Sequence, residues 1–200
     1  MKTAQEIHNI PTREREIVFA QEMVNIGRIT LSPLILEEDV PLIHDWVNRD
    51  YAKYWMMQNT SLEDVHREYE RLLTYSEIFI GAVNGKPSFL MEKYKTSDEV
   101  IGKHYRVESG DYGMHILVAP ADKPITNFTW YIFRFIMTFL FTDERVKRVV
   151  VEPDERNHKI HGLNRRAGFE YERTVKLPHK TACLAFCNYE QFSQAIKNQP

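Results

Sequence analysis

The stretch VVVEPDERNHKIHGLNRRAGF, residues 149–169, changes character at Pro153. Before the proline it is a short β-branched run, which is typical of a buried strand. After it, residues 157–167 form a polar segment that ends at Gly168, and a glycine in this place predicts the C-terminal end of a helix. The stretch therefore predicts a buried strand that ends near Asp154 and is followed by a polar helix.

The residues upstream complete a strand–helix–strand unit. Residues 111–120, DYGMHILVAP, alternate two sets of side chains in the manner of a central strand. Residues 128–141 are apolar nearly all round, which predicts a helix covered on most sides. A strand, a long helix and a strand predict a right-handed βαβ unit with two parallel strands.

The rest of the chain adds antiparallel strands and two helices. Residues 28–34 alternate as a strand, and helices are expected after Glu37 and from Ser61. Asn84-Gly85 predicts a tight hairpin turn, and two strand-like runs close the chain. We predict an arm over residues 1–26 and a single α/β domain with a mixed sheet over residues 27–200.

Composition excludes several classes of function. Of 200 residues, 43% are hydrophobic and the formal net charge is −2, so the chain can build a core and has no basic footprint for nucleic acid. No apolar stretch is long enough to span a membrane. Cys183 and Cys187 lie on one predicted strand about 13 Å apart, too far for a disulfide. We expect a reduced, cytoplasmic protein without membrane contact.

Two places in this fold are suited to a ligand. In an open sheet, ligands bind outside the carboxyl ends of the parallel strands, beside helix N-termini that favour anions. One such place is the turn that follows Pro120, and the other is the strand end at Asp154. A binding site at the strand tip would explain why this strand ends on the carboxylate of Asp154.

The order of elements and the segment NHKIHGLNRRAGF, residues 157–169, resemble the GCN5-related N-acetyltransferases (GNAT), which use acyl-CoA. In that family a helix begins near an asparagine and ends at Gly-Phe. The resemblance implies a central, mixed, twisted sheet with helices on both faces. It also implies that the strand with His115 and the strand that ends at Asp154 splay apart around the pantetheine arm.

A closer resemblance is to the branch that acylates lysine or diamines in hydroxamate siderophore assembly, such as the aerobactin, rhizobactin, alcaligin and mycobactin pathways. It extends from about residue 19 to residue 192. The segments that carry it are HDW (44–46), YW (54–55), EKY (92–94), GDYGMHILVAP (110–120), VVVEPDERN (149–157) and LPHKTACLAFC (177–187).

The resemblance implies roles for several residues. His115 would orient the acceptor, Asp154 would be the catalytic base, and backbone N–H groups at Leu117, Val118 and Ala119 would stabilise the oxyanion. The family's glycine-rich phosphate loop is replaced here by residues 121–127, which contain no glycine. We therefore expect the acyl-CoA phosphates to contact Lys123, the helix start near Thr126 and Asn127, and, from the polar helix, Asn157 and Arg165.

The chemistry of amide formation restricts the acceptor. An aspartate of ordinary pKa, about 3.9, is a poor base for a primary ammonium of pKa about 10.4. Either burial raises the pKa of Asp154, or the acceptor is N-hydroxylated and its nitrogen is largely neutral at pH 7. The second alternative makes a weak base sufficient and favours a hydroxylamine acceptor.

Other readings compete at each residue. His115 also fits a hydrogen-bonded core histidine, and Asp154 also fits a helix cap. Trp55 is our candidate for a wall along the acceptor's aliphatic chain, and Glu92 pairs either with the acceptor's distal ammonium or with a surface lysine. No metal site is expected, because His158 and His161 lack further ligands.

The sequence thus predicts an acyl-CoA N-acyltransferase for the terminal amine, hydroxylated or not, of lysine, putrescine or cadaverine. The acyl group is acetyl, succinyl or longer. Two alternatives remain: an acetyltransferase for another small amine, such as an aminoglycoside, and a non-catalytic acyl-CoA-binding module.

Overall fold

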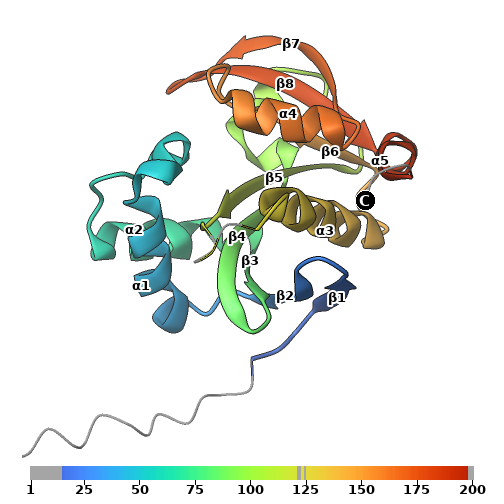
Figure 1. Cartoon of the computed structure of the whole chain (residues 1–200). Helices are drawn as coiled ribbons and strands as arrows, with labels where there is room; N and C mark the ends of the chain where they lie inside the picture. Colours follow the sequence, from blue (N-terminus) through green and yellow to red (C-terminus); the bar gives the residue numbers. More distant parts are fainter. Residues whose placement is uncertain (1–14, 121–122, 124, 198–200) are drawn as a thin grey trace, which may run out of the picture.

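The chain folds around one eight-stranded mixed sheet (Figure 1). The computed structural model describes residues 15–120, 123 and 125–197. The strands run in the order β1-β2-β3-β4-β5-β6-β8-β7, and only β5 and β6 are parallel. The strands are β1 (Phe19–Met23), β2 (Gly27–Pro33), β3 (Ser76–Val83), β4 (Lys86–Lys95), β5 (Asp111–Val118), β6 (Arg148–Val151), β7 (Glu170–Lys176) and β8 (Thr181–Asn188).

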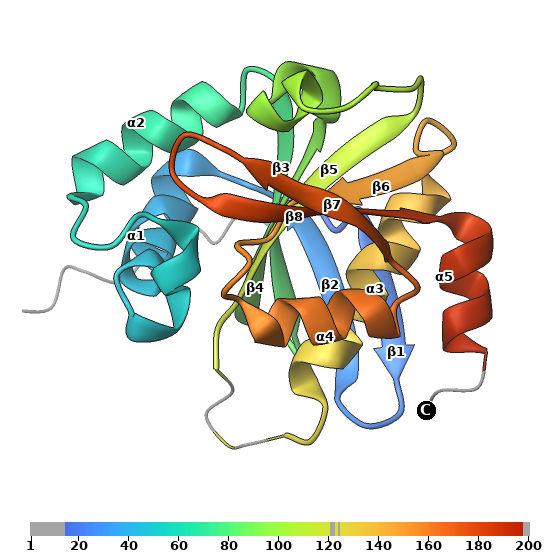
Figure 2. The ribbon, with the colours of Figure 1, turned by 90° about the horizontal axis from the view of Figure 1, so that it is seen from above.

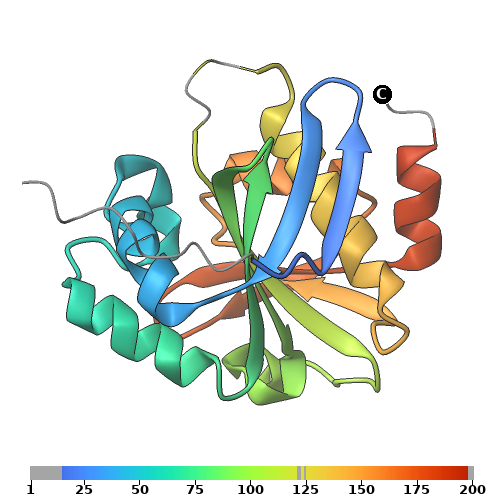
Figure 3. The ribbon, with the colours of Figure 1, turned by 90° about the horizontal axis from the view of Figure 1, so that it is seen from below.

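Helices cover both faces of the sheet (Figure 2). Helix α3 and its neighbour α4 pack on one face, and α1 and α2 on the other (Figure 3). The helices are α1 (Leu36–Val47), α2 (Leu62–Leu72), α3 (Phe128–Thr142), α4 (His158–Arg166) and α5 (Tyr189–Ile196), with short 3₁₀ turns η1 (Asp50–Trp55), η2 (Thr96–Asp98) and η3 (Val100–Lys103). The predicted α/β class is confirmed.

Local sequence signals determine many of these boundaries. Ser61 caps α2 by accepting a hydrogen bond from the Asp64 N–H, and the turn at Asn84 and Gly85 has positive φ at both residues, 50° and 79°. Gly168, with φ of 93°, follows α4. These three predictions are confirmed, as is the parallel β5–α3–β6 unit.

The alternation along β5 divides the core between the two faces. Tyr112 and Met114 pack against α3, whereas Leu117 packs in the cluster built with α1 and α2. Helix α3 is buried nearly all round, as its composition predicts, with Trp130, Phe133 and six other apolar side chains among its nine buried residues. No helix in the described residues is long and apolar enough to cross a membrane.

One boundary differs from the prediction. Residues 19–23 lie in the segment that we expected to be an arm, but they form β1 and pair antiparallel with β2. The strand lies at the sheet edge, and Met23 is its only buried residue. The alternation of buried and exposed side chains along it is therefore weak. Residues 1–14 of the expected arm lie outside the described residues.

Candidate active site at the tips of β5 and β6

A cavity of about 740 Å³ opens where β5 and β6 part. Their parallel pairing ends at Gly113 and Val150. Beyond this pair, Met114–Leu117 of β5 and Val151–Asp154 at the tip of β6 line the same cavity, together with η1 and α4. Of the predicted site residues, the cavity brings together His115, Asp154, Trp55, Leu117 and Asn157.

The cavity reaches both faces of the sheet. On the α3 side it is lined by Phe133 and by Ile160 and Asn164 of α4. On the other side it is lined by His115 and by Trp55 of η1, whose rings meet edge to face at 6.1 Å. One opening can therefore hold two reactants that approach from opposite faces.

The α3 side offers groups that suit a pantetheine arm. From Met114 onward β5 no longer pairs with β6. The backbone N–H and C=O groups of β5 that face β6 therefore make no strand-to-strand hydrogen bonds there. Asn164 is 1% exposed, and its side-chain oxygen has no hydrogen-bond partner among the described residues. An extended chain with two amides can satisfy such groups, so the residues present fit acyl-CoA.

His115 is held by two neighbouring strands. It is the register partner of Glu92 on β4, and its Nδ1 lies 2.9 Å from Glu92 Oε2. Tyr69 of α2 donates to the other Glu92 oxygen at 3.1 Å. Glu92 is therefore buried with both oxygens occupied, and we correct our prediction that it binds the acceptor's ammonium or a surface lysine.

The second His115 nitrogen faces another carboxylate. His115 Nε2 lies 3.3 Å from Glu152 Oε1 and 3.1 Å from the Tyr94 hydroxyl. Lys180, on the turn between β7 and β8, lies 3.5 Å from the same Glu152 oxygen. The groups Glu92, His115, Glu152 and Lys180 thus form a chain of alternating charge, which we call the charge chain.

The pKa values follow from this arrangement. Burial opposes the charged imidazole, but hydrogen bonds and charges from Glu152 and Glu92 outweigh it and raise the pKa of His115 to about 10. Burial also opposes the ionised form of Glu152, yet His115 and Lys180 hold its pKa below the usual value. Both shifts favour a protonated His115 beside an ionised Glu152.

Asp154 lies on the cavity wall in a different environment. Arg156 donates to both carboxylate oxygens and lowers the pKa of Asp154 to about 2. The Asp154 side chain is only 6% exposed. The idea that burial raises the pKa of this aspartate is therefore wrong, because the neighbouring guanidinium outweighs burial.

The backbone of β5 corrects the expected oxyanion donors. The Ala119 N–H donates to the Ser88 carbonyl at 2.9 Å and is not available. Backbone N–H groups alternate between the two edges of a strand, so the Val118 N–H points toward the β6 side, where the strands have parted. Val118 does not line the cavity itself, but of the three predicted residues only its N–H points to this side of β5.

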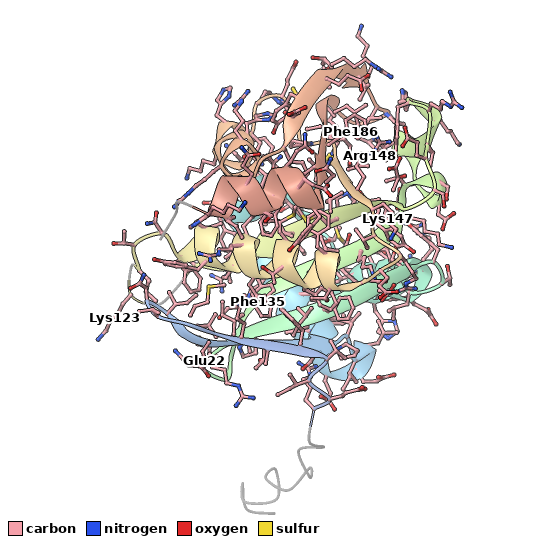
Figure 4. The ribbon with its side chains drawn as sticks, turned by 90° about the vertical axis from the view of Figure 1, so that its right-hand side faces the viewer. Glu22, Lys123, Phe135, Lys147, Arg148 and Phe186 are labelled. Carbon is pink, nitrogen blue, oxygen red and sulfur yellow. The ribbon has the colours of Figure 1, made fainter. Side chains whose placement is uncertain are left out.

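The residues predicted to hold the CoA phosphates lie at three places. Lys123 and Ala119 line a second groove, of about 1090 Å³, and Lys123 is exposed and points away from the protein body (Figure 4). Thr126 is exposed, and Asn127 precedes α3 with φ of 61°. Residues 121–122 and 124 of the glycine-free loop lie outside the described residues.

The last two predicted contacts are on α4. Asn157 lines the cavity and also caps the helix, accepting from the Ile160 N–H at 3.5 Å. Arg165 lies over the Tyr171 ring, 4.9 Å from its centroid, and lines a different groove from the one at β5 and β6. The structure therefore does not bring Arg165 to the other predicted residues.

Our reading of the sequence missed Glu152 and Lys180. Glu152 is two residues before Asp154, and alternation places it on the sheet face of Val150, which is also the face of His115. That signal is readable in the sequence. The approach of Lys180 is not, because it depends on how the β7–β8 turn folds back over β6.

Comparisons with known proteins agree with this architecture. Residues 35–177 match the family model described as an acetyltransferase (GNAT) domain. A solved structure of an uncharacterised protein from Bacillus halodurans superposes with a TM-score of 0.82 at 25% identity, covering 88% of this chain and 93% of that one. An aminoglycoside acetyltransferase crystallised with coenzyme A gives 0.73 at 23% identity, covering 83% and 98%, and shares the fold.

Curated relatives extend along most of the chain. An Escherichia coli N(6)-hydroxylysine O-acetyltransferase is 27% identical over 74% of this chain and 48% of its own length, so the chain spans about half of that relative. An N-hydroxyputrescine acetyltransferase of Acinetobacter baumannii is 25% identical over 82% of this chain and 79% of its own length. Because the family model matches well over half of the chain, the chain belongs to the GNAT acetyltransferase family.

Proposed function

We propose that the protein transfers an acyl group from acyl-CoA to the N-hydroxylated terminal amine of lysine or a related diamine, giving a hydroxamate of the kind used in siderophores. The observation that supports this most directly is that neither of the two predicted acid–base residues is a free base. The contacts of His115 with Glu92 and Glu152 favour its protonated form, and both oxygens of Asp154 are bound by Arg156. Such a site requires an acceptor nitrogen that is neutral before it reacts.

A hydroxylamine meets that requirement, whereas a plain amine does not. A primary amine of pKa about 10.4 is neutral in only about one molecule in two thousand at pH 7. An attached hydroxyl withdraws electrons and leaves the nitrogen largely neutral. At pH 7 the neutral fraction of a hydroxylamine therefore exceeds that of a plain primary amine by about three powers of ten.

In the proposed reaction the neutral nitrogen attacks the thioester carbonyl and the C–S bond breaks, and the leaving CoA thiolate takes up a proton from solvent to give the free thiol. The nitrogen becomes positive as it bonds, so its proton is then acidic enough for Asp154 to accept. The Val118 N–H stabilises the oxyanion as the carbonyl oxygen turns negative. Trp55, the last residue of η1, lines the cavity and packs along the aliphatic chain of the acceptor.

The names of the relatives support this acceptor class. Two relatives named above are acetyltransferases of an N-hydroxylated lysine or diamine, and a lysine N-acyltransferase of Mycobacterium tuberculosis is 26% identical over 66% of this chain and 65% of its own length. We place the reaction in the cytoplasm, since the two cysteines are free.

An aminoglycoside is the second candidate acceptor, because an aminoglycoside N(6')-acetyltransferase of Klebsiella pneumoniae is 24% identical over 72% of this chain and 76% of its own length. A polycation needs unpaired carboxylates. Of the three acidic residues that line the cavity, Glu152 and Asp154 already contact cations, which leaves Asp50. The cavity is therefore poorly suited to several ammonium groups.

The test is release of free thiol by purified protein with acetyl-CoA or succinyl-CoA. The acceptors are lysine, putrescine, cadaverine, their N-hydroxy forms and kanamycin. We expect turnover with one hydroxylamine at least a hundredfold above its parent amine. Equal turnover with the parent amine, or preference for kanamycin, contradicts the proposal. No turnover with retained acyl-CoA binding in calorimetry identifies a non-catalytic acyl-CoA-binding module.

A further inference from the structure

Both ring nitrogens of His115 face carboxylate oxygens. Nδ1 lies 2.9 Å from Glu92, and Nε2 lies 3.3 Å from Glu152. An ionised carboxylate can only accept hydrogen bonds, so each of these contacts requires a proton on the nitrogen that it meets. A neutral ring could donate its one N–H to Glu92 and accept at Nε2 from the Tyr94 hydroxyl, 3.1 Å away, but only the imidazolium can also donate to Glu152.

Three strands set this geometry. Glu92, His115 and Glu152 occupy β4, β5 and the tip of β6, and their side chains lie on the sheet face opposite α3. Glu92 alone would leave the ring with one charged partner. Because Glu152 follows the point where β5 and β6 part, it reaches the other ring nitrogen across the mouth of the cavity.

We infer that Glu152 is a positioning residue: with Glu92 it keeps His115 doubly protonated and turned toward the cavity, so that His115 acts as a fixed cation rather than as a proton acceptor. The His115 side chain is 37% exposed, whereas those of Glu92 and Glu152 are 6% and 8% exposed. The histidine therefore meets the acceptor, and the glutamates act through it.

This inference rests on the proposed function and narrows its substrate class. Glu92 and Glu152 balance the charges of His115 and Lys180, but His115 is the most exposed of the four. Its positive charge therefore disfavours an ammonium placed directly beside it and tolerates a neutral hydroxylamine. Selection for the neutral nitrogen would then come from the charge of the site as well as from the lack of a strong base.

The groups that face His115 come from every element around it. Glu92 and Tyr94 belong to β4, and Glu152 follows β6. Tyr69 of α2 reaches the ring through Glu92. Lys180, on the β7–β8 turn, reaches it through Glu152, and the remaining neighbour, Trp55 of η1, does not titrate. Lys180 opposes the charge on His115, whereas both glutamates favour it.

Two variants therefore have opposite effects on the ring. Glu152→Gln keeps the shape and an acceptor oxygen but removes the charge, so the pKa of His115 should fall by at least one unit. Lys180→Met removes a competing cation from Glu152, so the pKa of His115 should rise. Glu155→Gln, at an exposed neighbouring position, is the matched control and should change neither.

The measurement is a pH titration of the imidazole nitrogens by NMR, with His115 assigned from the His115→Gln spectrum. The titration does not depend on turnover, so it reports the protonation state of His115 even if the proposed reaction is wrong. We expect imidazolium signals for His115 at pH 8 in the unaltered protein. A neutral ring at pH 8, or a midpoint that Glu152→Gln leaves in place, overturns the inference. If Glu152→Gln fails to fold, the unaltered protein and Lys180→Met still decide it.

Kinetics then test the positioning role. In Glu152→Gln we expect kcat with the hydroxylamine to fall about tenfold, the KM for acyl-CoA to stay within twofold, and the alkaline limb of the pH profile to move to lower pH. A kcat and an alkaline limb equal to those of the Glu155→Gln control would show that Glu152 has no role in positioning.

Discussion

Arg156, two residues after Asp154, binds its carboxylate through both the side chain and the backbone. Its Nε donates to Asp154 Oδ1 at 2.9 Å, its Nη2 donates to Oδ2 at 2.7 Å, and its backbone N–H donates to Oδ1 at 2.9 Å. The guanidinium is 73% exposed while the carboxylate is 6% exposed. The carboxylate is thus fixed at the tip of β6, ionised and weakly basic, on the wall of the cavity.

The first prediction concerns Asp154 itself. In Asp154→Asn we expect kcat with the preferred hydroxylamine to fall by about 10² to 10⁴, the range for removal of a general base. The KM for acyl-CoA should not change, because Asp154 is not among the residues that we expect to contact the CoA phosphates. Glu155→Gln serves as control, and a mutant that keeps more than half of the activity would exclude Asp154 as the base.

The second prediction concerns the pH dependence of stability. The pKa of Asp154 is lowered to about 2 in the folded protein, below about 3.9 when unfolded, so the pairing stabilises the fold above pH 4 and is lost as the pH falls toward 2. Urea unfolding of Arg156→Gln should show a small deficit in stability at pH 6, since Arg156 is mostly exposed and its charge is screened by solvent.

This deficit should shrink on acidification, and it should be absent at every pH in Lys159→Gln. Lys159 is an exposed cation of α4 for which no ion pair is found among the described residues. A deficit of constant size from pH 6 to pH 3 would mean that Arg156 acts through packing rather than through the charge of Asp154.

The third prediction concerns the acceptor wall. Trp55→Ala removes the ring that meets His115 edge to face, and loss of an aromatic contact of about 1.4 kcal/mol corresponds to a tenfold rise in the acceptor KM. The KM for acyl-CoA is the internal control. If both constants rise together, Trp55 supports the cavity as a whole and does not bind the acceptor.

The fourth prediction concerns the space beneath Tyr94. A methyl group on Gly113 would lie 2.2 Å from the Tyr94 ring, so Gly113→Ala should displace the ring from His115 and destabilise the fold by about 1–3 kcal/mol. Gly162→Ala, in open space on α4, should instead stabilise the protein by about 0.5–1 kcal/mol. Equal thermal shifts for the two variants would refute the packing argument.

The parts of the fold that were predictable have short-range causes. The Asn84-Gly85 turn, the Ser61 cap and the alternation along β5 depend on neighbouring residues, and the structure has all three. Edge strand β1 and helix α5 were not predicted. Strand β1 buries little of its surface, and α5 begins at an Asn188–Gln191 capping box that follows a strand without an intervening loop.

The site was predictable in its location but not in its charge. The tips of β5 and β6 were expected to form it, and His115 and Asp154 both line the cavity there. The pairing of Glu92 with His115 depends on the register of β4 against β5, which is fixed by the whole sheet. The low pKa of Asp154 depends on how the Arg156 side chain folds back on it, and neither contact is visible in a local pattern.

The central claim is that this cavity selects a neutral hydroxylamine nitrogen, and a competition measures it directly. Equal amounts of N6-hydroxylysine and lysine are mixed with limiting acetyl-CoA and the purified protein at pH 7, and the two products are quantified by mass spectrometry. The account predicts at least a hundredfold excess of the hydroxamate, with the lysine product rising about tenfold per pH unit as its amine loses its proton. Comparable amounts of both products at pH 7 would contradict it.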